Sequence, residues 1–125
     1  MKAKVLIVDD SSLARRTVRA VLEELGHTVE EVSDGNQAIE RFYLGRPDLV
    51  VLDMVMTGMY GLDVLAKIRE MNPEARVIVV TADIQQSTQD QVKAAGASGF
   101  INKPVNRQKL TDAVAKVLEG GSTWN

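Results

Sequence analysis

Short runs of aliphatic and β-branched residues alternate with longer amphipathic stretches along the whole chain. Three runs are almost continuously apolar, as is typical of strands buried on both faces, whereas the second and fifth runs suit less buried or edge strands. The predicted strands are residues 4–9, 27–32, 48–53, 76–81 and 98–102. Between them, apolar residues recur at helical spacing. The predicted helices are residues 12–26, 34–45, 61–73, 84–96 and 106–121.

This strict alternation of strands and helices predicts the fold class α/β, with a doubly wound, parallel five-stranded sheet that carries helices on both faces. The length of 125 residues suits a single domain. We expect that domain to span residues 1–119 and the segment GGSTWN, residues 120–125, to form a flexible tail. Ligands of such sheets bind beyond the carboxyl ends of the strands, so the residues that follow each strand are the candidates for function.

Composition narrows the classes of function. The net charge of −2 gives no reason to expect binding to nucleic acid or to a membrane surface. The absence of cysteine excludes disulfides and thiolate metal sites. No apolar run approaches the roughly 20 residues that span a bilayer, and the amino terminus lacks the features of a signal peptide, so we expect a cytoplasmic protein. The single histidine, His27, begins the second strand, which favours a surface or capping role over a role as phosphoryl donor.

Carboxylates, a hydroxyl and an ammonium group follow four of the five predicted strands. These residues are Asp9 and Asp10, Asp53, Thr81 and Ala82, and Lys103. A lone Asp at a strand end is usually a cap or a turn former, so the inference depends on the whole set. Each pair of carboxylates in contact would repel by on the order of 1 to 4 kcal/mol, which a divalent cation would offset. Ligands that are all oxygen atoms favour a hard ion such as Mg²⁺.

Asp53 ends the predicted central strand and is the candidate nucleophile, since aspartyl phosphates are known protein intermediates. Lys103 and the Thr81 hydroxyl can each pair with a phosphoryl oxygen, and the cation would neutralise charge during transfer. A Mg²⁺-dependent hydrolase is one alternative, but it usually needs a general acid at the position of Val55. A flavin- or nucleotide-binding module is another, although the sequence DDSS after the first strand places negative charge where phosphate would bind.

Four segments, in order and at the expected spacing, resemble the receiver domain of bacterial two-component response regulators, especially the single-domain chemotaxis type. They are LIVDDS, DLVVLDMVMTGMYG, VIVVTA and GFINKP, and the resemblance covers residues 4–119. It implies a flavodoxin-like (βα)5 fold with strand order 2-1-3-4-5 and a cis peptide bond between Lys103 and Pro104. The family usually has Pro in place of Thr57, so a more mobile loop is expected there.

The resemblance also implies a role for each candidate residue. Asp53 would be the phosphoacceptor, and Mg²⁺ would bind Asp10, Asp53 and the backbone carbonyl of Val55, with Asp9 acting mainly through water. The phosphate-binding and switch residues would be Thr81, Ala82, Lys103 and the aromatic Phe100. Val55 and Asp83 flank the phosphoryl site, where such residues often tune the access of water.

The function implied by the resemblance is a phosphorylation-dependent switch rather than an enzyme that turns over a free substrate. A sensor histidine kinase would donate the phosphoryl group. A target protein would bind the face made by the fourth helix, fifth strand and fifth helix, and a phosphatase is a further expected partner. Chemotaxis is one pathway for such a switch. The alternative is an intermediate phosphorelay receiver, or a phosphate sink, with no output target of its own.

Overall fold

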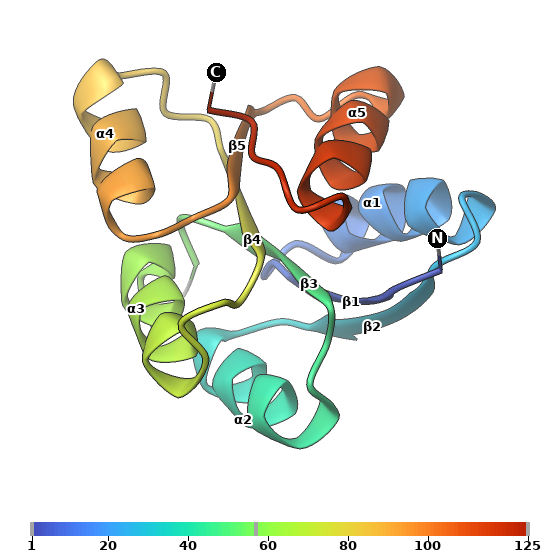
Figure 1. Ribbon diagram of the computed structural model, residues 1–125, viewed down its shortest axis with the longest axis horizontal. Coiled ribbons are helices and arrows are strands. Elements are labelled where there is room, and N and C mark those ends of the chain that lie inside the picture. Colours follow the sequence, from blue (N-terminus) through green and yellow to red (C-terminus); the bar gives the residue numbers. More distant parts are fainter. Residues whose placement is uncertain (1, 57, 125) are drawn as a thin grey trace.

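The computed structural model describes residues 2–56 and 58–124, so Thr57 and the loop mobility expected there lie outside the described residues. Within this part of the chain, five strands alternate with five helices, as the sequence predicts (Figure 1). The strands are β1 (Lys4–Val8), β2 (Thr28–Val32), β3 (Leu49–Asp53), β4 (Val77–Thr81) and β5 (Gly99–Asn102). The helices are α1 (Ser12–Glu24), α2 (Gly35–Gly45), α3 (Gly61–Met71), α4 (Gln86–Ala94) and α5 (Arg107–Leu118).

All strand pairs are parallel, and the strand order is β2-β1-β3-β4-β5, which confirms the expected fold class and topology. Strand β3 is central, with β1 on one side and β4 on the other. The register places Val8 beside Leu52 and Asp53 beside Val80. Because parallel strands run in one direction, the carboxyl ends of β1, β3, β4 and β5 meet at the same edge of the sheet.

Helices cover both faces of the sheet (Figure 1). One apolar cluster lies beneath α1 and α5, and the other lies beneath α2, α3 and α4. Strand β1 supplies both clusters alternately, since Val5 and Ile7 belong to the first and Leu6 and Val8 to the second. Successive side chains of a strand point to opposite faces, so burial on both faces requires the continuous apolar runs seen in the sequence.

Gly61 allows α3 to begin directly against the end of β3. A Cβ atom at this position would lie 2.6 Å from Met54 Cα and 2.7 Å from the carbonyl oxygen of Asp53. Both contacts involve backbone atoms, which cannot move aside as the end of a flexible side chain can. The glycine therefore keeps the start of α3 close to the segment that follows Asp53.

The segment after α5 is not the loose tail that its composition predicts. The amide of Thr123 donates to the carbonyl of Ser98 at 3.0 Å, and the Trp124 indole Nε1 donates to the carbonyl of Ala97 at 2.8 Å. An edge strand offers unpaired backbone groups, and a tryptophan ring buries a large apolar area, so these contacts outweigh the flexibility of the preceding glycines. Asn125 lies outside the described residues.

The peptide bond between Lys103 and Pro104 is cis, as the resemblance implies. Among the helices that the structure describes, none has the length and hydropathy that crossing a lipid bilayer would require.

Candidate functional site

Three carboxylates converge at the carboxyl edge of the sheet. Asp9 and Asp10 follow β1 and Asp53 ends β3, and one oxygen atom of each lies within 4.8 Å of the others. Asp9 and Asp53 are buried, whereas Asp10 is exposed. The adjacency of β1 and β3 thus brings together the three acidic residues that the sequence predicts at this edge, although Asp53 lies more than forty positions from the other two in the chain.

Lys103 places a positive charge between two of these carboxylates. Its Nζ lies 3.3 Å from Oδ1 of Asp53 and 3.6 Å from Oδ2 of Asp9. The backbone amide of Lys103 donates to the carbonyl of Thr81 at 2.8 Å, which fixes the loop after β5 against the end of β4. This ammonium group offsets part of the repulsion within the acidic cluster.

Local hydrogen bonds hold Asp9 in place. Its Oδ1 accepts from the amide of Ser11 at 2.9 Å, just before α1 begins. The Arg15 guanidinium donates to the carbonyl of Asp9 at 2.7 Å and pairs with Glu31 on β2 at 3.0 Å. The buried aspartate is therefore oriented by both the start of α1 and the neighbouring strand.

Thr81 and Asp83 connect the end of β4 to α4. The buried Thr81 hydroxyl oxygen accepts from the amide of Asp83 at 3.1 Å. The Asp83 carboxylate accepts from the Thr88 hydroxyl at 2.6 Å and from the amide of Gln85 at 2.9 Å. These hydrogen bonds, led by that from Thr88, lower the pKa of Asp83. The sequence predicts Asp83 beside the site but does not predict the role of Thr88, for which the only signal is a hydroxyl in the helix that follows.

Burial raises the pKa of Asp53 above its ordinary value of 3.8, and the negative charge of Asp9 raises it further. Lys103 opposes both effects without cancelling them. Only 6 % of Asp53 is exposed, so solvent screens these charges poorly. The folded protein therefore holds a proton on Asp53 more tightly than the unfolded chain does when no cation is bound.

Asp53→Asn should consequently stabilise the protein in chelator at neutral pH. The free energy of unfolding of the wild type should fall as pH rises from about 3.8 through the raised pKa of Asp53, because the folded state binds the extra proton. The variant lacks this titration, so its advantage should reach the order of 1 kcal/mol at neutral pH and vanish below the ordinary pKa of Asp. Urea denaturation of both proteins across this range measures the difference, and equal stability at neutral pH would contradict the prediction.

The remaining predicted site residues lie at different distances from the acidic cluster. Ala82 lines a groove of about 530 Å³ beside Asp53 and Lys103, and the exposed Leu13 forms part of its rim. Val55 is exposed two residues after Asp53. Phe100 is half-buried on β5 with its ring centroid 6.2 Å from that of Trp124. The structure thus gathers all but Phe100 near the carboxyl edge of the sheet.

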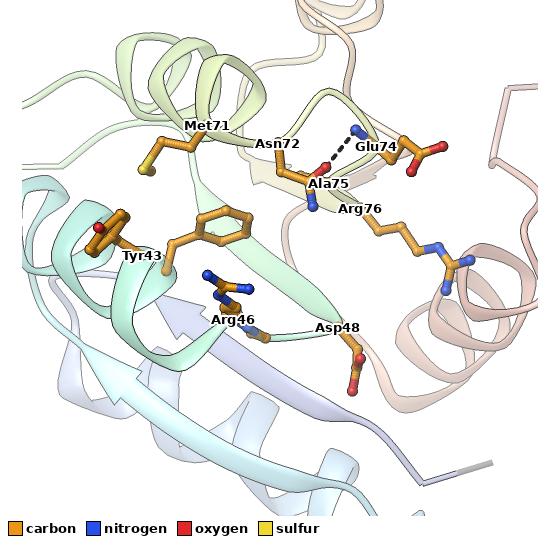
Figure 2. Close-up of a pocket in the computed structure, with 10 residues that line it drawn as sticks. Tyr43, Arg46, Asp48, Met71, Asn72, Glu74, Ala75 and Arg76 are labelled. Atoms are coloured by element: carbon orange, nitrogen blue, oxygen red, sulfur yellow. Dashed lines mark hydrogen bonds between the residues drawn. The ribbon is translucent and has the colours of Figure 1, made fainter.

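A second hollow, of about 750 Å³, lies at the opposite edge of the sheet (Figure 2). It is bordered by the carboxyl ends of α2 and α3 and by the residues that precede β3 and β4. Side chains of both charges surround it, including Arg46, Asp48 and Glu74 (Figure 2). It shares no lining residue with the groove beside Asp53.

His27 lies at the amino end of β2, at the edge of the sheet opposite Asp53. Its Nδ1 accepts a hydrogen bond from the amide of Ala3 at 3.1 Å. Burial lowers the pKa of His27, which favours the neutral ring that this acceptor role requires. These contacts agree with the capping role that the sequence predicts.

Known proteins are similar to this chain in sequence and in fold. Residues 5–115 match the family model described as response regulator receiver domain. The chain is 35% identical over 118 residues to the chemotaxis protein CheY of Halobacterium salinarum, covering 94% of this chain and 98% of that protein. It is 34% identical over 118 residues to the sporulation initiation phosphotransferase F of Bacillus subtilis, covering 94% and 95%. The crystal structure of a CheY-like receiver domain protein from Methanospirillum hungatei superimposes with a TM-score of 0.90 at 25% identity, covering 96% of each chain.

Proposed function

Because this chain belongs to the response regulator receiver domain family, and is a CheY-like phosphoacceptor signalling protein, we propose that Asp53 accepts a phosphoryl group from a phosphohistidine of a sensor kinase. One observation carries the proposal. The Asp53 carboxylate ends the central strand, 3.3 Å from the Lys103 ammonium and in contact range of Asp9 and Asp10. This arrangement combines a nucleophilic oxygen with charges that can hold a phosphoryl group beside it.

In the proposed transfer, a carboxylate oxygen of Asp53 forms a bond to phosphorus while the bond between phosphorus and the donor imidazole nitrogen breaks. The bonding electron pair returns to the imidazole, and the product on the protein is an acyl phosphate. Lys103 would pair with one phosphoryl oxygen, and the Thr81 hydroxyl, which accepts from Asp83 in this structure, retains a proton that it can donate to another.

The donor set at this edge suits Mg²⁺. Three carboxylates with oxygen atoms within 4.8 Å of one another form an all-oxygen cluster, and beside it the Lys103 ammonium supplies a single positive charge. Asp10, Asp53 and the carbonyl of Val55 would hold the ion directly, with Asp9 acting through water. When bound, Mg²⁺ supplies positive charge that stabilises the transferring phosphoryl group.

We place the output at the face made by α4, β5 and α5, where a target protein would bind according to the state of Asp53. A phosphatase is a further proposed partner. The similarity to CheY supports a target in chemotaxis, whereas the nearly equal similarity to a sporulation phosphotransferase supports a phosphorelay intermediate. A target that binds only the beryllofluoride-loaded protein would favour the first role, and transfer of the phosphoryl group onward to a histidine protein would favour the second.

Incubation with acetyl phosphate and Mg²⁺ tests the central proposal. Intact mass spectrometry should show the gain of one phosphoryl group, and peptide mapping after borohydride reduction should locate it on Asp53. Excess chelator should prevent the gain, because the acidic cluster would then lack the charge it needs. Incorporation at another residue, or none in the presence of Mg²⁺, would overturn the proposal.

A further inference from the structure

The segment Ser122–Trp124 forms hydrogen bonds along the free edge of the sheet. Figure 1 shows this part of the chain, in dark red, running beside β5 between α4 and α5. The amide of Thr123 donates to the carbonyl of Ser98, and Thr123 Oγ1 accepts from the amide of Phe100, each at 3.0 Å. The segment thus satisfies one acceptor and one donor that an edge strand would otherwise expose.

Gly99 provides the space in which Thr123 sits between these two hydrogen bonds. A Cβ atom on residue 99 would lie 2.9 Å from Thr123 Cγ2 and 3.3 Å from Ile78 Cγ1. Ile78 belongs to the core beneath the strand, so a larger residue would have to displace Thr123 instead. The glycine therefore leaves the edge of β5 open to close approach by a threonine.

Trp124 makes three contacts of different kinds on the same face. Its indole Nε1 donates to the carbonyl of Ala97 at 2.8 Å. Its ring lies 6.2 Å from that of Phe100 between centroids, with the planes inclined by 36°. The Lys93 ammonium lies 5.8 Å from the ring centroid, within the range of cation–π attraction. A carbonyl, an aromatic ring and a cation thus surround one indole.

These groups span the margin of the core, since Lys93 is exposed and Ala97 is buried. Trp124 is only half-buried, at the margin of one apolar cluster, and the buried members of that cluster do not include it. Helix α4, which supplies Lys93, contributes only Thr88 and Val92 to the buried residues. The surface comprises Lys93, Ala97, Ser98, Gly99 and Phe100, and we call it the indole site.

We propose that the indole site binds an extended peptide segment of a partner protein that carries a tryptophan, and that Thr123 and Trp124 occupy the site in cis as a competitor. Such a partner would add a short strand to β5, as in other cases of peptide binding at a sheet edge. The inference rests on the proposed function for one point, that the partner is a target whose binding responds to Asp53. The covering segment would have to leave before that target could bind.

Titration of the full-length protein with a peptide of residues 120–124, acetylated and amidated, tests this competition. In the variant Trp124→Ala the peptide should shift the backbone amide resonances of residues 93–100 toward their positions in the wild type. The peptide should bind the wild type at least tenfold more weakly, since a cis segment that is docked nine-tenths of the time leaves one-tenth of the sites open. The same peptide with Ala in place of Trp should restore none of these shifts.

Two further variants make the result decisive. Trp124→Leu keeps an apolar side chain but removes the indole. If Trp124→Ala unfolds, this variant replaces it, and the peptide should cause the same shifts of the backbone amide resonances. Tyr43→Ala removes an exposed aromatic side chain from α2 and should bind the peptide as weakly as the wild type does. Equal affinity for wild type and Trp124→Ala, or no binding to either Trp124 variant, would overturn the proposal. The titration contains no phosphoryl donor, so its failure leaves the phosphorylation of Asp53 unaffected, and loss of phosphorylation leaves the titration unaffected.

Discussion

Replacing Asp53 with Asn should abolish phosphoryl incorporation from acetyl phosphate, with a rate at least roughly 1,000-fold below that of the wild type, as for the loss of other enzyme nucleophiles. The side-chain amide of Asn has nearly the same shape as the Asp carboxylate, but it lacks a nucleophilic carboxylate oxygen. It also lacks the negative charge that would attract a cation. Asn nearly matches Asp in shape and removes a charge whose burial raises the pKa of Asp53, so the substitution should leave the fold intact. Intact mass measured over time, with Mg²⁺ present, gives both rates.

Asp48→Asn is the matched control for this experiment. Asp48 precedes the same strand, β3, but at its amino end, where the carboxylate accepts from the amide of Lys4 at 2.8 Å. The substitution changes the net charge by the same amount as Asp53→Asn, and it lies at the edge of the sheet opposite the acidic cluster. It should therefore keep the wild-type rate. Loss of incorporation in both variants would point to a general charge effect and would contradict a specific role for Asp53.

Lys103→Gln should slow incorporation by roughly 100-fold while leaving Asp53 in place, which is the usual effect of removing one group that stabilises a transition state. The Lys103 ammonium contacts the carboxylates of Asp53 and Asp9, and glutamine cannot supply its charge to a phosphoryl oxygen. A second readout separates this effect from unfolding. In chelator, the variant should lose stability relative to the wild type as pH rises, because two buried carboxylates lose their neutralising partner.

Lys67→Gln serves as the control for Lys103. Lys67 lies on the surface of α3, where it pairs with Glu70 at 4.0 Å. Exposed pairs of this kind contribute little to stability, so neither the rate nor the stability should change appreciably. A wild-type rate of incorporation in Lys103→Gln would show that this lysine has no part in the transfer, whatever its distance from Asp53.

The sheet and the acidic cluster could be predicted because both follow from local patterns. Burial on two faces demands apolar residues at every position, which marks β1, β3 and β4 in the sequence. Parallel strands then carry Asp9, Asp53 and Lys103 to the same edge of the sheet. The order of the strands came from the resemblance to receiver domains, since periodicity alone does not tell which strands are neighbours.

Patterns along the sequence could not predict contacts between residues that lie far apart in the chain. The segment GGSTWN has the composition of a loose end, and nothing near it in the sequence shows that Ala97, which precedes Trp124 by 27 positions, accepts its indole proton. The missed signal was the tryptophan itself, because so large an apolar ring is seldom left in water. The hydrogen bond from Thr88 to Asp83 was missed for a different reason, because a serine or threonine in a helix has many partners within reach.

The position of Trp124 has a practical consequence. It is the only tryptophan in the chain, and it lies on the face made by α4 and β5 rather than beside Asp53. The intrinsic fluorescence of the whole protein therefore originates almost entirely from this one face. Stopped-flow mixing of unlabelled protein with a phosphodonor can then measure the rate of a structural change on this face through the fluorescence of Trp124. That rate is measured separately from the chemistry at the other end of β5.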